Sequence, residues 1–175
     1  MKNVTVTSGT ITQNGSNTSF IGGIAGANLS GALIEYCYST GNVIGTTGGF
    51  GIAGSNPAGS TVRNCVELSP KVTTSNSASV SRIASASGTL TNNKARADMK
   101  IGFSGSEAAV PTDQTGVNSE HGANVAVGSS TALSSVFSGW DTAIWNINTS
   151  LNFIVGGSLP TLKPNPQSAT TLPAS

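Results

Sequence analysis

The sequence predicts an all-β fold: a short right-handed parallel β-helix of about three coils with a tryptophan-containing C-terminal cap. Three observations predict this class. A phrase recurs along the chain, the composition is dominated by glycine and small polar residues, and no long stretch shows helical periodicity. A repeat of fixed length indicates stacked units, because one unit cannot bury its own apolar face.

The recurring phrase begins with Ile-Ala-Gly at residues 24–26 and returns 28 residues later at 52–54, and a weaker third copy begins at Ile83. Further equivalent positions are Gly31, Gly59 and Gly88; Ile34, Val62 and Thr91; Cys37, Cys65 and Lys94; and Val43 and Val72. Residues in register on neighbouring strands lie about 4.8 Å apart. We therefore expect Ile24, Ile52 and Ile83 to stack as an interior ladder, and Ile34 to stack with Val62.

The repeat divides the chain into coils, a cap and a tail. Residues 1–101 are expected to form the coils, with a partial coil at 3–11, full coils at 20–47 and 49–78, and a shorter coil at 80–101. Three brief strands are expected per coil, at 20–26, 32–38 and 42–44 in the first. Residues 102–163 are predicted as an irregular or β-structured cap of the same domain with a candidate strand at 123–127, and residues 164–175 as a tail or linker.

The first residues match the middle of a coil. Val4, Val6, Gly9 and Ile11 correspond to Tyr36, Tyr38, Gly41 and Val43 at an offset of 32 residues. We therefore expect the chain to be a piece of a larger parent protein. The rest of that parent chain would be one of its partners.

The cap is expected to hold both tryptophans at the end of the coils. An open β-helix end exposes apolar ladders and unpaired strand edges, which favour end-to-end association unless they are covered. Trp140 and Trp145 lie near Phe137 and Ile144 in the sequence, so we expect them to plug the end of the core. The alternative is that the two rings stack on sugars at the surface.

Composition argues against several classes of function. Charged residues make up 9% of the 175 residues and the net charge is +1, which gives no electrostatic footprint for nucleic acid. No apolar run reaches the roughly 18 residues of a membrane-spanning helix, so no membrane insertion is expected. The first residues lack the apolar segment of a signal peptide.

Three blocks of the sequence resemble the GLUG-motif repeat family of large bacterial cell-surface proteins. They are residues 22–28 with residues 37–43; residues 82–84, 89–93 and 97–99; and the Gly-Trp-Asp to Leu-Pro-Thr-Leu-Lys ending at residues 139–163. The third repeat departs from the motif, with Ser85 for glycine and Lys94 for cysteine. The resemblance covers roughly residues 20–163 and implies an extracellular, adhesin-like β-helix module with no catalytic residues to carry over.

Two motifs that suggest chemistry are explained by the repeat. Residues 49–54 have the GxGxxG spacing of dinucleotide-binding sites, but a turn follows where such a site needs a helix. Cys37 and Cys65 occupy equivalent positions in adjacent coils. We favour a stacked pair of buried thiols over a disulfide, because in-register side chains hold their Cβ atoms farther apart than a bridge prefers.

Several polar residues have structural interpretations. Asn64 and Asn93 are expected to share the position of Tyr36 and to stack as a hydrogen-bonded ladder. Glu35 and the Arg63 position are expected to pair on the outer surface. His121 is the only histidine and is expected to be an exposed loop residue.

The densest group of charges is Lys94, Arg96, Asp98 and Lys100. Its alternation predicts a solvated strand edge or turn, and it is also a candidate contact for an acidic glycan.

These features favour a non-enzymatic β-helix module of a bacterial cell-surface protein, acting as a spacer or adhesin-like surface for host or cell-surface glycans or proteins. The alternative is a fragment of a carbohydrate-binding or carbohydrate-active β-helix protein, which would need a cleft lined by close carboxylates or exposed aromatics. The candidate ligand contacts are Trp140, Trp145, Lys94, Arg96 and Asp98. No catalytic residue, cofactor or metal site is expected.

Overall fold

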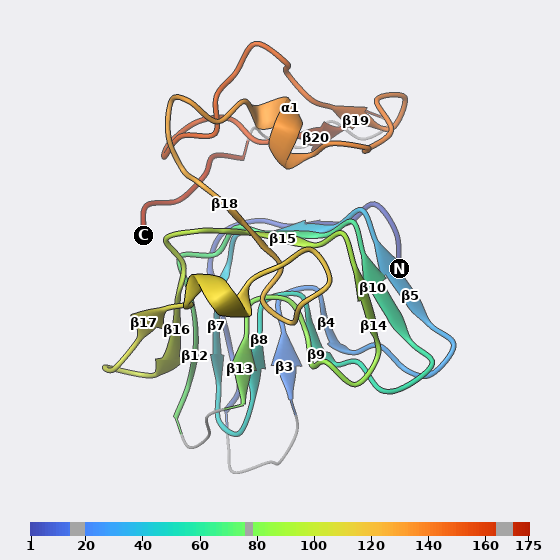
Figure 1. Cartoon of the computed structure of the whole chain (residues 1–175), viewed down its shortest axis with the longest axis vertical. Helices are drawn as coiled ribbons and strands as arrows, with labels where there is room; N and C mark the ends of the chain where they lie inside the picture. The colour runs from blue at the N-terminus through green and yellow to red at the C-terminus, as the bar shows by residue number, and fades with distance from the viewer. Residues whose placement is uncertain (15–19, 76–78, 164–169) are drawn as a thin grey trace.

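Short strands joined at tight corners build a parallel β-solenoid of about four turns (Figure 1). The computed structural model describes residues 1–14, 20–75, 79–163 and 170–175. Within these residues the only helical segments are α1 (Leu133–Val136) and a 3-10 turn (Thr112–Gln114), and neither is long enough to cross a membrane. The predicted all-β, parallel β-helix class is confirmed.

The strands follow the turns in chain order. The partial first turn holds β1 (Thr5–Val6) and β2 (Thr10–Thr12), and the next holds β3 (Ile21–Gly22), β4 (Ala25–Ala27), β5 (Leu33–Glu35), β6 (Tyr38–Ser39) and β7 (Asn42–Gly45). The third holds β8 (Gly49–Phe50), β9 (Ala53–Ser55), β10 (Thr61–Arg63), β11 (Val66–Glu67) and β12 (Lys71–Thr74). The fourth holds β13 (Val80–Ser81), β14 (Thr89–Thr91), β15 (Lys94–Arg96) and β16 (Lys100–Phe103). They are followed by β17 (Ala108–Ala109), β18 (Ala123–Val125), β19 (Trp145–Asn146) and β20 (Thr161–Leu162).

A turn contains more and shorter strands than the three expected, because each predicted long strand is broken by a corner. Tyr36, Asn64 and Asn92 occupy the same corner of successive turns with φ of 53°, 52° and 52°. This left-handed conformation cannot continue a strand, so the segment 32–38 divides into β5 and β6. Asn92, and not Asn93, is therefore the partner of Asn64, and its Nδ2 donates to Asn64 Oδ1 at 2.7 Å.

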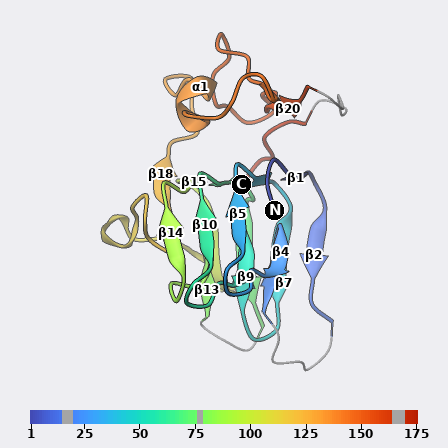
Figure 2. The same cartoon turned by 90° about the vertical axis from the view of Figure 1, so that its right-hand side faces the viewer.

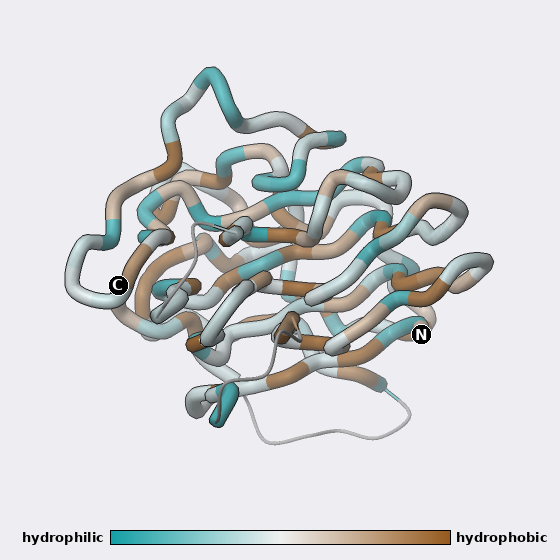
Figure 3. The backbone as a smooth tube through the Cα atoms, turned by 90° about the horizontal axis from the view of Figure 1, so that it is seen from below, coloured by the Kyte–Doolittle hydropathy of each residue, from teal (hydrophilic) through white to brown (hydrophobic). Residues whose placement is uncertain are grey.

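Strands of successive turns pair in register and form the sides of the solenoid. One side, here called sheet B, is β1-β6-β11-β15-β18, and a second five-stranded side is β17-β16-β12-β7-β2. Shorter sides are β14-β10-β5, β13-β8-β3 and β4-β9. Figure 2 shows β14, β10 and β5 side by side, and Figure 3 shows the turns from below as adjacent runs of backbone.

The expected interior ladders form the core. The backbone nitrogen of Ile24 donates to the carbonyl of Ile52, and that of Ile52 to the carbonyl of Ile83, both at 2.9 Å. Ile52 and Ile83 are completely buried. Val62 lies in register with Ile34, as predicted.

The third repeat has a different register from the one expected. Val62 pairs with Leu90, so the predicted match with Thr91 is wrong by one residue and Thr91 faces solvent opposite Arg63. By the same shift, Lys94 pairs with Val66, and Asn93 takes the cysteine position. Asn93 is buried there, with its Oδ1 accepting from the Cys65 nitrogen at 3.0 Å and its Nδ2 donating to the Val62 carbonyl at 2.9 Å.

The partial first turn follows the expected offset over only part of its length. Ile11 pairs with Val43, as the offset of 32 requires. Val6, however, pairs with Ser39, so the expected match of Val6 with Tyr38 is wrong by one residue.

The solenoid also extends beyond residue 101. β18, at the position of the candidate strand, adds to sheet B beside β15. The preceding loop covers the last turn, since Val117 and Glu120 accept backbone hydrogen bonds from Asn93 and Ile83.

The tryptophan segment lies along the side of the solenoid, so the expected end cap is not what forms. We call residues 126–163 and 170–175 the C-terminal lobe; in Figures 1 and 2 it lies above sheet B and crosses several turns. It forms a second apolar core with Tyr38, Val66 and Leu68 of the coils. The end of the last turn is covered by the loop before β18, which leaves the lobe free to cover the side.

The end of the chain is part of this lobe. Residues 164–169 of the predicted tail lie outside the described residues, but Thr171 pairs with Ser158 in an antiparallel bridge. Leu172 is 1% exposed and joins the second apolar core. The described part of the predicted tail at 164–175 therefore packs on the lobe through the buried side chain of Leu172.

Leu90→Ala and Thr91→Ala test the register of the third repeat. Leu90→Ala should lower the free energy of unfolding by about 2–4 kcal/mol because it empties an interior ladder position, and Thr91→Ala by less than about 0.5 kcal/mol. Urea unfolding followed by circular dichroism measures both. Equal losses, or a larger loss for Thr91→Ala, would contradict this register.

Candidate functional site

The charged candidates from the sequence lie where sheet B meets the C-terminal lobe. Lys94 begins β15 and Arg96 ends it, so both side chains leave the same face of the strand. Val66 and Tyr38 are in register with Lys94 on that face, and both are buried beneath the lobe. The face is therefore an internal interface between the coils and the lobe.

Lys94 binds the end of the short helix α1. Its Nζ donates to the carbonyls of Ser135 at 2.7 Å and Val136 at 3.0 Å, and to Ser138 Oγ at 2.9 Å. The last carbonyls of a helix lack intrahelical donors, and the Lys94 ammonium group acts as the donor for those of α1. Burial lowers the pKa of Lys94.

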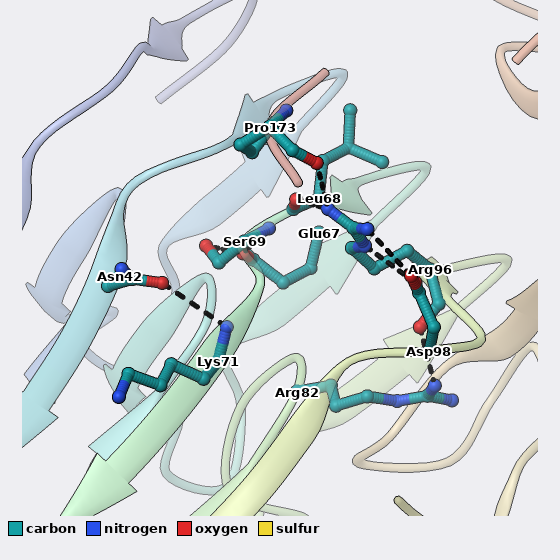
Figure 4. A network of polar contacts seen from close by, with 9 residues as sticks. All are labelled: Asn42, Glu67, Leu68, Ser69, Lys71, Arg82, Arg96, Asp98 and Pro173. Carbon is teal, nitrogen blue, oxygen red and sulfur yellow. Dashed lines mark hydrogen bonds and ion pairs between the residues drawn. The ribbon is translucent and has the colours of Figure 1, made fainter. Parts of the chain in front are cut away.

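Arg96 joins the coils to the end of the chain (Figure 4). Its guanidinium makes two parallel contacts with the Asp98 carboxylate, at 2.7 and 2.8 Å, and donates to the carbonyls of Leu68 at 3.3 Å and Pro173 at 2.8 Å. Arg96 is completely buried, so the predicted solvated strand edge is wrong at this residue. The Arg96 guanidinium also lowers the pKa of Asp98.

Arg82 is a second buried arginine, and no pattern in the sequence indicates its burial. Its guanidinium donates to the carbonyls of His121 at 2.8 Å, Gly122 at 3.0 Å and Arg96 at 3.1 Å. It thereby ties the loop before β18 to the coils. Burial lowers the pKa of Arg82 to about 10.

His121 is 6% exposed, so the expected exposed loop histidine is wrong. Its Nδ1 accepts from the backbone nitrogen of Arg82 at 3.5 Å. Burial, together with the positive charge of Arg82, lowers the pKa of His121 to about 4. The ring is therefore a neutral acceptor near neutral pH.

Glu67 is a completely buried carboxyl group in β11. Its Oε1 accepts from the Ser69 nitrogen at 2.9 Å and contacts the Ser69 hydroxyl, which itself donates to the Gly41 carbonyl at 2.6 Å. Because that hydroxyl has one proton, a protonated Glu67 supplies the donor for the second contact. Burial raises the pKa of Glu67 well above its usual range, which agrees with this assignment.

The side chain of Glu67 points into the solenoid. Its Oε2 has no hydrogen-bond partner among the described residues, and neither has the Oγ of Ser39, its in-register neighbour. Gly51 faces the Glu67 side chain, and a Cβ at Gly51 would lie 2.4 Å from Glu67 Cγ. The glycine therefore makes room for an inward carboxyl group.

The two tryptophans form an aromatic cluster with the coils. Trp145 is 1% exposed and Trp140 6% exposed, and their ring centroids lie 4.6 Å apart. Trp145 packs 6.0 Å from Tyr38 and donates its Nε1 to Asn3 Oδ1 at 3.3 Å. The expected burial of both rings is confirmed, although at the side of the solenoid.

The remaining motifs have structural roles. Glu35 pairs with Arg63 at 2.7 Å and Lys2 at 3.2 Å, as the predicted outward pair requires. Cys37 and Cys65 are buried free thiols, and burial raises the pKa of Cys65. The GxGxxG segment enters β9, and no helix follows it. No group of three or more potential metal ligands occurs among the described residues.

A groove of about 490 Å³ is lined by residues of β8, β9 and β13. Figure 1 shows β8 and β13 on the side of the solenoid away from the lobe. Its lining comprises Phe20, Phe50, Ser55, Pro57, Ala58, Ser79, Val80, Ser81, Ser85, Ser87 and Glu120. None of the predicted contact residues lines it. The aromatic, hydroxyl and carboxyl groups come together here only because successive turns stack.

No protein-family profile, curated protein or solved structure matches the chain.

Arg96→Leu and Arg63→Leu test the importance of the buried junction. Arg96→Leu should lower the free energy of unfolding by about 3–5 kcal/mol because it leaves buried carbonyls and a carboxylate without their donor. Arg63→Leu removes an arginine that is 47% exposed and should cost less than about 1 kcal/mol. Chemical denaturation followed by tryptophan fluorescence measures both, and similar losses would contradict the junction.

His121→Asn tests the buried histidine. The folded-state pKa is about 4, below the usual 6.5, so the stabilising effect of the neutral ring is complete above pH 6.5 and is lost as pH falls towards 4. The unfolding free energy of the wild type minus that of His121→Asn should decrease by about 3 kcal/mol between pH 7 and pH 4. Glu67 has a raised pKa and therefore contributes stability at low pH. This contribution is present in both proteins, so it cancels in the difference between their unfolding free energies. A difference that does not change with pH would refute the assignment.

Proposed function

We propose that the chain is a non-enzymatic β-solenoid module of a bacterial cell-surface protein, acting as a spacer or adhesin-like binding surface. The observation that carries the proposal is the engagement of Trp140, Trp145, Lys94 and Arg96 with the chain itself. Residues that suggested a ligand site instead hold the lobe on the coils. These residues therefore stabilise the contact between the lobe and the coils.

The proposed setting rests on the resemblance to GLUG-motif repeat proteins. That resemblance supports an extracellular location, attachment through a larger parent chain, and glycans or proteins of a host or cell surface as partners. The fold supports the mechanical part of the proposal, because each turn is joined to the next by parallel hydrogen bonding on several sides.

The carbohydrate-active alternative has less support. A glycosidase needs two carboxyl groups placed on either side of one bond. Glu35 is paired with two cations at the surface, Glu67 is completely buried, and Asp98 is bound by Arg96. These carboxyl groups have structural partners or no access to solvent, which favours binding over hydrolysis.

Surface labelling and adhesion test the proposal on intact cells of the source bacterium. Antibodies against the purified chain should label these cells, and proteinase K added outside should remove the label. Beads coated with the chain should adhere to cells or extracellular matrix more than beads coated with equal amounts of albumin. Labelling that requires cell lysis would contradict the cell-surface setting, and adhesion no greater than that of albumin would leave only the spacer role.

A further inference from the structure

The groove beside β8, β9 and β13 presents an aromatic ring that the coils hold in place. Phe20 is 43% exposed, and its ring packs edge-on against buried Phe50 with centroids 5.5 Å apart. The ring also lies on Gly48, where a Cβ would come within 2.2 Å of a Phe20 ring carbon. An exposed ring fixed in this way loses little freedom when a ligand packs on it.

The polar lining of the groove is almost entirely hydroxyl groups. Ser55, Ser85 and Ser87 come from β9 and from the equivalent segment of the next turn, and all three are at least partly exposed. Ser85 Oγ accepts from the backbone nitrogen of Asn56 at 3.1 Å, which fixes its position and leaves its proton to donate. Hydroxyl groups can both donate to and accept from a polar ligand.

Among the described residues, Glu120 is the only charged one that lines the groove. Its side chain is 45% exposed and lies 3.8 Å from His121 Nε2. Partial burial raises its pKa. A carboxylate with two acceptor oxygens matches a pair of neighbouring hydroxyl donors on a ligand.

We infer that this groove binds a neutral saccharide, an inference that rests on the proposed adhesin-like function and gives it a ligand class. The apolar face of a sugar ring packs on Phe20, and its hydroxyl groups bond to the serines and Glu120. The volume of about 490 Å³ is within the range of small-ligand sites. The groove accordingly holds a short stretch of a longer glycan.

Other ligand classes fit this chemistry less well. An anionic ligand meets the Glu120 carboxylate and no lining cation, which disfavours an acidic glycan here. A metal ion would find only one carboxylate, Glu120, among the described residues of the lining. A purely apolar ligand would desolvate the serine hydroxyls without replacing their hydrogen bonds.

Calorimetric titration of the whole chain with defined oligosaccharides tests the inference. The neutral probes are cellohexaose, maltohexaose, laminarihexaose and hexa-N-acetylchitohexaose, and the acidic probes are hexagalacturonate and a heparin hexasaccharide. At least one neutral probe should bind. Phe20→Ala and Glu120→Gln should each weaken that binding about tenfold, because each removes one of the anchoring contacts.

Matched variants outside the groove separate binding from folding. Phe103→Ala removes a phenylalanine of similar exposure (45%), and Asp113→Asn neutralises an exposed carboxylate; both should change the Kd less than about twofold. Circular dichroism of every variant confirms the fold. Binding of acidic probes alone, binding of none, or binding insensitive to Phe20→Ala and Glu120→Gln would overturn the inference. Surface labelling and bead adhesion would then still decide the proposed function independently.

Discussion

In-register stacking of one turn on the next is the constraint on which the rest of this structure depends. Parallel pairing places equivalent residues about 4.8 Å apart. Every inward side chain must therefore pack against the equivalent side chains of the turns before and after it. Ile24, Ile52 and Ile83 satisfy this with apolar side chains. Asn93 satisfies it differently, by using its amide to complete the backbone hydrogen bonds of the turn beneath. At this position the interior accepts a polar residue because both the oxygen and the nitrogen of the Asn93 amide have backbone partners.

In sheet B, apolar side chains of the third turn face away from the interior of the solenoid and towards the lobe. Val66 and Leu68 face outward and Glu67 faces inward. The outward pair would be unfavourable in water, but the C-terminal lobe covers it. Lys94 and Arg96 then connect lobe and coils through carbonyl groups, so the lobe and the outward apolar face each require the other.

The sequence predicted those features that repeat and missed those that depend on the lobe. The ladders and the stacked thiols follow from positions that recur between turns. The third-turn register, by contrast, could not be obtained from single matched letters, because Leu90 and Thr91 both fit an alternating pattern. The inward direction of Glu67 could not be obtained from the sequence, since only the neighbouring lobe makes Val66 and Leu68 an interior pair. The burial of Arg82 and His121 depends on a loop that has no counterpart in the repeat.

The same constraint explains why a ligand groove forms at outward positions. Stacking restricts the inward side chains but not the outward ones, which can differ from turn to turn. The residues around Ile21, Gly49 and Val80 are in register, and the position preceding them is Phe20 in one turn, Gly48 in the next and Ser79 in the last. The glycine gives the phenylalanine ring a place to lie, and the serine turn adds hydroxyl groups beyond it. A regular scaffold thus produces one irregular, chemically mixed surface, and specificity for a ligand is most readily built into that surface.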